Sequence, residues 1–97
     1  MNLGKLLILD DDEILLRRLS KSMESFGFEV TAVSSIEEAE EIIEKIIFDT
    51  AVLDLKLADG SGLSIVKKLS SSNPECRAIM LTGFGNIATA VAAMKVG

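Results

Sequence analysis

The chain has 97 residues, of which 48% are hydrophobic and 26% charged, so we expect one globular domain over residues 1–97. The net charge of −5 argues against a nucleic-acid-binding surface, because phosphate contacts need clustered Lys and Arg. His is absent, which excludes His-based zinc sites and His-dependent catalytic triads within the chain. No apolar run approaches the roughly 20 residues of a membrane helix, and no signal-peptide pattern is seen, so we expect no membrane partner.

The single cysteine, Cys76, cannot form a disulfide within the chain, so a reducing cytoplasm is the expected setting. A lone thiol can serve as a redox sensor, or it can be a small residue packed beside a turn. Asn73 and Pro74 predict a turn just before Cys76, and we favour the second interpretation.

Short apolar runs alternate with helical patterns along the chain. Three such runs predict buried strands at residues 6–9, 50–53 and 78–81, and Phe28, Val30, Thr31 and Val33 form a further strand candidate over residues 28–33. Apolar residues at helical spacing follow each run, and they predict helices over residues 14–26, 36–46, 63–69 and 87–96.

Residues typical of helix ends punctuate this pattern in chain order. Gly27 is expected to end the first helix in the left-handed conformation. Ser35 and Glu38 form a capping box at the start of the second helix. Asn86 is a candidate N-cap of the last helix.

The strands are too apolar for a sheet with one wet face, so the pattern predicts a parallel sheet with helices on both faces. In such α/β folds, ligands bind at the carboxyl ends of the strands, where the strand order reverses. The residues that follow the strands there are Asp10, Asp11, Asp12, Asp54, Thr82 and Gly83.

Carboxylates that converge at one sheet edge repel each other, and a hard divalent cation such as Mg²⁺ removes the conflict. An ionised Asp54 beside that cation is a nucleophile suited to phosphoryl transfer. The hydroxyl of Thr82 and the backbone N–H of Gly83 are candidate donors to phosphate oxygens.

Each feature also has an ordinary structural interpretation. The acidic run that starts at Asp10 can cap the first helix, Asp54 can be a turn residue, and Thr82 can bond to backbone. Chance does not readily place all three features at one edge of a sheet, and their joint occurrence favours the functional interpretation.

These residues resemble a known family over essentially the whole chain. The matching stretches are residues 7–13, 51–57, 59–63 and 79–83. They are similar to the CheY-like receiver domains of two-component response regulators, which implies a flavodoxin-like, doubly wound parallel sheet. The expected strand order is 2-1-3-4, with the family's fifth strand and helix missing from this chain.

The resemblance implies a role for each matching residue. Asp54 would accept the phosphoryl group and contact the Mg²⁺ ion. Asp11 would be a direct ligand, Asp10 would bind directly or through water, and the backbone carbonyl of Lys56 would be a further protein ligand. Asp12 would not touch the ion.

At the end of the fourth strand, the resemblance makes Thr82 the switch hydroxyl and places Gly83 at the phosphate pocket. A narrower likeness, over residues 59–63 and 81–91, is to the RegA/PrrA/ActR regulators. That likeness implies a transcriptional role, with DNA bound only through an output domain absent from this chain. The expected partner is a histidine kinase or its phosphotransfer domain.

The chain departs from the family pattern in three ways. Ala58 stands where many receivers have Pro. The Lys that ends the family's fifth strand is absent, and so are that strand and the following helix. Residues 78–81 are therefore expected to form an open sheet edge that promotes self-association. The alternative function is a truncated receiver that acts only as an interaction or dimerisation module.

Two enzyme or ligand-binding classes fit less well. Haloacid-dehalogenase-type phosphatases need a second Asp two residues after the nucleophile, and here that residue is Lys56. Dinucleotide and P-loop folds need a Gly-rich loop after the first strand, where this chain has the acidic run from Asp10. We therefore expect a phosphoacceptor signalling domain, not an enzyme acting on a separate substrate.

Overall fold

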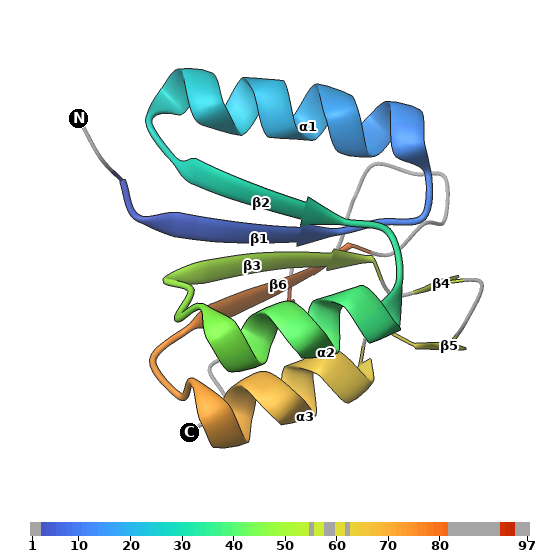
Figure 1. Cartoon of the computed structure of the whole chain (residues 1–97), viewed down its shortest axis with the longest axis vertical. Coiled ribbons are helices and arrows are strands. Elements are labelled where there is room, and N and C mark those ends of the chain that lie inside the picture. The colour runs from blue at the N-terminus through green and yellow to red at the C-terminus, as the bar shows by residue number, and fades with distance from the viewer. Residues whose placement is uncertain (1–2, 55, 58–59, 62, 82–91, 95–97) are drawn as a thin grey trace.

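A computed structural model of the chain describes residues 3–54, 56–57, 60–61, 63–81 and 92–94. Its central sheet has the strand order β2-β1-β3-β6-β7 (Figure 1). The parallel strands are β1 (Lys5–Leu9), β2 (Glu29–Val33), β3 (Thr50–Asp54) and β6 (Arg77–Leu81). Counted among themselves, these strands have the order 2-1-3-4, which confirms the predicted topology.

Helices cover both faces of the sheet (Figure 1). The helix α1 (Glu13–Phe26) lies on one face, and α2 (Ile36–Lys45) and α3 (Leu63–Ser72) lie side by side on the other. An ion pair of 3.7 Å between Lys68 and Glu44 joins α3 to α2. The arrangement confirms the predicted doubly wound α/β fold.

Strand β1 shows why continuous apolar runs predict buried strands. Leu6 and Ile8 point into the core under α1, whereas Leu7 and Leu9 point into the core under α2 and α3. All four side chains are at most 1% exposed. Because successive side chains of a strand alternate between faces, both faces of β1 must be apolar.

The helix ends predicted at Gly27 and at Ser35 are confirmed. Gly27 has φ of 108° and ends α1, and its N–H donates to Glu24 O at 3.0 Å. Ser35 is the N-cap of α2, where its Oγ accepts a hydrogen bond of 3.1 Å from Glu38 N–H. The carboxylate of Glu38 in turn accepts from Ser34 N–H at 3.2 Å. The hydrogen bonds that this carboxylate accepts from Ser34 lower the pKa of Glu38.

The predicted last helix is wrong where the structure can test it. Its N-cap, Asn86, lies outside the described residues, but Ala92–Met94 form a strand, β7, and not a helix. Strand β7 pairs antiparallel with β6, so that Ala78 faces Met94. The pairing satisfies backbone groups along the edge of β6, and this long-range gain outweighs the helical preference of alanine.

The same pairing corrects the expected open edge. Over Ala78–Met80 the strand β6 lies between β3 and β7, so its backbone is not available there for a second copy of the chain. Self-association through this edge therefore has no structural support over these residues.

Within the described residues, no helix has the length and apolar character needed to span a membrane.

Cys76 lies in the core at the amino-terminal edge of the sheet. Its side chain is buried, and its N–H donates to Asn73 O at 3.0 Å. Burial, with a smaller effect from nearby Asp49, raises the pKa of Cys76 to about 11. A buried thiol that stays protonated at neutral pH supports the structural interpretation over the redox sensor.

Candidate functional site

Three carboxylates gather at the carboxyl ends of the neighbouring strands β1 and β3. One side-chain oxygen each from Asp10, Asp11 and Asp54 lies within 4.8 Å of the other two. The strand register explains the meeting: Leu9 is paired with Leu53, so the residues that follow them stand level. The donor set consists of oxygens alone, which suits a hard cation such as Mg²⁺.

Asp10 is the most buried member of this acidic cluster. It is 5% exposed, and its backbone N–H donates to Val33 O at 3.2 Å. Its Oδ1 accepts a hydrogen bond of 2.9 Å from Asp12 N–H. Burial raises the pKa of Asp10, and the negative charges of Asp54 and Asp11 raise it further, against the hydrogen bond from Asp12. A bound cation would relieve this repulsion.

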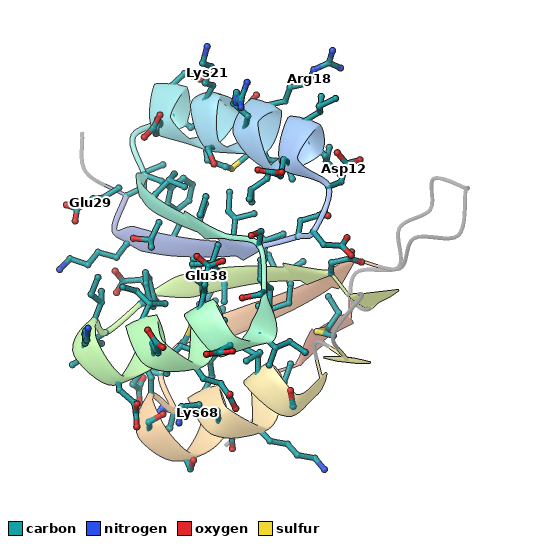
Figure 2. All side chains as sticks on the ribbon, turned by 45° about the vertical axis from the view of Figure 1, so that its right-hand side comes forward. Asp12, Arg18, Lys21, Glu29, Glu38 and Lys68 are labelled. Carbon is teal, nitrogen blue, oxygen red and sulfur yellow. The ribbon has the colours of Figure 1, made fainter. Side chains whose placement is uncertain are left out.

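Asp12 has a different position from the two acids before it. It is the N-cap of α1, and its Oδ1 accepts hydrogen bonds of 3.1 Å from Ile14 N–H and from Leu15 N–H. Figure 2 shows Asp12 at the start of α1 and Glu38 at the start of α2, on opposite faces of the sheet. The structural interpretation of the acidic run therefore holds for Asp12, whereas Asp10 and Asp11 approach Asp54.

Lys56 lies two residues beyond the cluster, in a hairpin that the sequence did not predict. The two-residue strands β4 (Lys56–Leu57) and β5 (Gly60–Ser61) pair antiparallel. The hairpin follows directly from the end of β3, which puts the Lys56 backbone near the carboxyl edge of the sheet. That its carbonyl binds a cation remains a prediction.

Thr82 and Gly83 lie outside the described residues, so their expected roles also remain predictions. They follow Leu81, which is paired with Asp54 in the register of β6 against β3. Sequence reasoning missed the carbonyl of Val33, which anchors the backbone of Asp10. No side-chain pattern could have revealed it, because the contact is made by backbone alone.

The response regulator receiver domain family model matches residues 6–97 of this chain. The photosynthetic apparatus regulatory protein RegA of Cereibacter sphaeroides is 48% identical over 92 residues, which are 95% of this chain and 50% of that protein. The acid tolerance regulatory protein ActR of Rhizobium meliloti is 46% identical over 92 residues, 95% of this chain and 47% of that protein. The chain thus spans about half the length of these curated relatives.

Solved structures agree with this relationship. A response regulator from Burkholderia pseudomallei, with a phosphorylated aspartic acid, calcium ion and citrate, has a TM-score of 0.79 and 32% identity, over 89% of this chain and 51% of that chain. A CheY-like receiver domain protein from Methanospirillum hungatei has a TM-score of 0.81 and 31% identity, over 89% of this chain and 69% of that chain. The chain belongs to the response regulator receiver domain family, the signalling domain of two-component systems.

Proposed function

We propose that this receiver domain accepts a phosphoryl group on Asp54 in a reaction that requires Mg²⁺ held by Asp10, Asp11 and Asp54. The observation that carries the proposal is the meeting of these three carboxylates at the ends of β1 and β3, within 4.8 Å of one another. The calcium ion and phosphorylated aspartic acid of the Burkholderia pseudomallei relative support it, since that protein has the same fold.

The proposed transfer needs few protein groups. A carboxylate oxygen of Asp54 attacks the phosphorus of a phosphohistidine. A new P–O bond forms, the P–N bond breaks, and its electron pair stays on the imidazole. When bound, Mg²⁺ neutralises charge on the phosphate oxygens. Asp10 and Asp11 keep the cation beside Asp54, and the backbone carbonyl of Lys56 completes the protein ligands.

Two residues after β6 complete the proposed pocket. The hydroxyl of Thr82 and the N–H of Gly83 donate to phosphate oxygens, and Thr82 turns toward the phosphoryl group as the switch. Their position in the sequence, directly after the residue paired with Asp54, supports this assignment.

The phosphodonor in this proposal is a histidine kinase or a phosphotransfer domain in the cytoplasm. Ile14 and Leu15 are 68% and 40% exposed at the start of α1, close to the acidic cluster, where a donor surface can cover them. Exposed apolar side chains beside a reactive group are suited to docking a partner. The relatives are named as regulatory proteins, and in this proposal the receiver domain itself does not bind DNA.

The proposal is tested by incubating the chain with Mg²⁺ and acetyl phosphate and measuring its intact mass. We expect one added phosphoryl group in the wild type and none in Asp54→Asn. Glu37→Gln is the matched control, because it removes an exposed carboxylate from the first turn of α2, and it should behave as wild type. Unmodified wild type, or equal modification of Asp54→Asn, would overturn the proposal.

A further inference from the structure

We propose that Asp12 is a positioning residue for the cation: by capping α1 it fixes the backbone N–H that orients the Asp10 carboxylate. This inference rests on the proposed metal site, but it assigns a task to an acidic residue that is not among its ligands. It predicts that the Asp12 side chain controls Mg²⁺ affinity without touching the ion.

The first step of the argument is the geometry of Asp12 itself. Its side chain accepts from Ile14 N–H and Leu15 N–H at 3.1 Å each, and its carbonyl accepts from Leu16 N–H at 2.9 Å. Three hydrogen bonds from the first turn of α1 therefore end on one residue. They hold its backbone at φ −84° and ψ 101°, an extended conformation just outside the helix.

The second step is what this fixed backbone does for Asp10. The N–H of Asp12 donates to Asp10 Oδ1 at 2.9 Å. From the other side, Val33 O accepts the backbone N–H of Asp10 at 3.2 Å. Asp10 is therefore held at its backbone by β2 and at its carboxylate by the turn into α1. Its side chain, 5% exposed, has little space in which to reorient.

The third step is the consequence of losing the cap. Without the Asp12 carboxylate, the peptide that precedes α1 loses two of its three hydrogen bonds and keeps the one from Leu16 N–H to the Asp12 carbonyl. Its own N–H can then turn away from Asp10 Oδ1. A ligand whose supporting hydrogen bond is lost binds metal less well, typically by about 10- to 100-fold. Asp12 would thus act through orientation, although its negative charge also lies near the site.

The variants Asp12→Ala and Asp12→Asn separate orientation from charge. Asn is as good an N-cap as Asp, so Asp12→Asn keeps the cap and loses the charge, whereas Asp12→Ala loses both. We expect the Mg²⁺ dissociation constant, measured by calorimetric titration, to rise roughly tenfold or more in Asp12→Ala. In Asp12→Asn it should stay within about threefold of wild type.

Ser35→Ala is the matched control for a purely structural effect. Ser35 caps α2 at the same edge of the sheet, through a hydrogen bond of 3.1 Å from Glu38 N–H, as Asp12 caps α1. Removing either cap should lower thermal stability by a similar amount. The group that donates to the Asp10 carboxylate is the backbone N–H of Asp12, which lies at the N-cap of α1 and not at that of α2. Ser35→Ala should therefore leave Mg²⁺ affinity unchanged.

Each result decides the matter. Equal Mg²⁺ affinities in Asp12→Ala and Ser35→Ala would overturn the inference, as would an Asp12→Asn variant as weak as Asp12→Ala. If Asp12→Ala does not fold, Asp12→Gly replaces it, because Gly is tolerated at an N-cap but leaves the backbone free. Wild type that binds no Mg²⁺ would overturn the proposed function instead.

Discussion

The side-chain amide of Asn73 donates a hydrogen bond of 2.7 Å to the carbonyl of Phe48, 25 residues earlier in the chain. Asn73 is buried directly after α3, and Phe48 is buried just before β3. The contact ties the end of one crossover to the start of a central strand, at the sheet edge opposite the acidic cluster.

Asn73→Ala should therefore destabilise the fold and spare the site. It leaves the buried Phe48 carbonyl without this donor, which costs about 1–3 kcal/mol of unfolding free energy in a chemical denaturation experiment. Ser72→Ala is the control, since the exposed Ser72 hydroxyl donates to Lys68 O in its own helix. A loss of Mg²⁺ affinity in Asn73→Ala beyond that in Ser72→Ala would contradict this separation.

Gly4→Ala should be more costly than Gly27→Ala. Both glycines have a left-handed φ, of 105° and 108°. A methyl group at Gly4 would also lie 2.5 Å from Asp49 Oδ2, the atom that accepts a hydrogen bond from Lys5 N–H at 2.8 Å. The left-handed φ alone should cost each variant about 1 kcal/mol of unfolding free energy. Gly4→Ala should lose more because of the close approach to Asp49. Equal melting temperatures for the two variants would show that Asp49 adapts freely.

Stability should decline at alkaline pH because of Cys76. Its pKa in the folded protein is about 11, above the ordinary value of 9.0. The folded state therefore holds a proton that the unfolded state releases first. The stabilisation is complete below pH 9 and disappears as the pH rises toward 11. When the melting temperature is plotted against pH, the values for wild type and Cys76→Ala should converge between pH 9 and 11. A constant difference between the two proteins over that range would contradict the assignment.

Mg²⁺ should reverse a stability order at the acidic cluster. Without a divalent cation, Asp54→Asn should be more stable than wild type, because it removes one of three charges that lie within 4.8 Å of one another. With saturating Mg²⁺, wild type should become more stable than Asp54→Asn, since ligand binding to the folded state stabilises it. A chelator should make Asp54→Asn the more stable protein again. An identical response to Mg²⁺ in both proteins would argue against a metal site that includes Asp54.

The fold was predictable because its signals are local. Three apolar runs and the strand candidate at residues 28–33 marked the parallel strands, and Gly27 and Ser35 marked where helices end and begin. Strand β7 was missed because Ala92–Met94 fit a helical pattern by themselves, and only the distant partner β6 makes them a strand. Local sequence carries little information about such pairing.

The candidate site was predictable in composition but less so in detail. Strand topology placed Asp54 beside Asp10 and Asp11, as the structure has them. Strand topology alone did not distinguish the three acids, and the family resemblance set Asp12 apart from the ligands. The N-cap geometry of Asp12 depends on the backbone angles of the turn before α1, which the sequence does not show.

The identity of the phosphoacceptor is the central claim, and chemical trapping tests it most directly. After reaction with Mg²⁺ and acetyl phosphate, borohydride reduction converts an aspartyl phosphate into homoserine, which peptide mass spectrometry can locate. We predict homoserine at Asp54 and at no other acidic residue, and only when Mg²⁺ is present. Homoserine at Asp10, Asp11 or Asp12, or its absence from Asp54 in the presence of Mg²⁺, would contradict the claim.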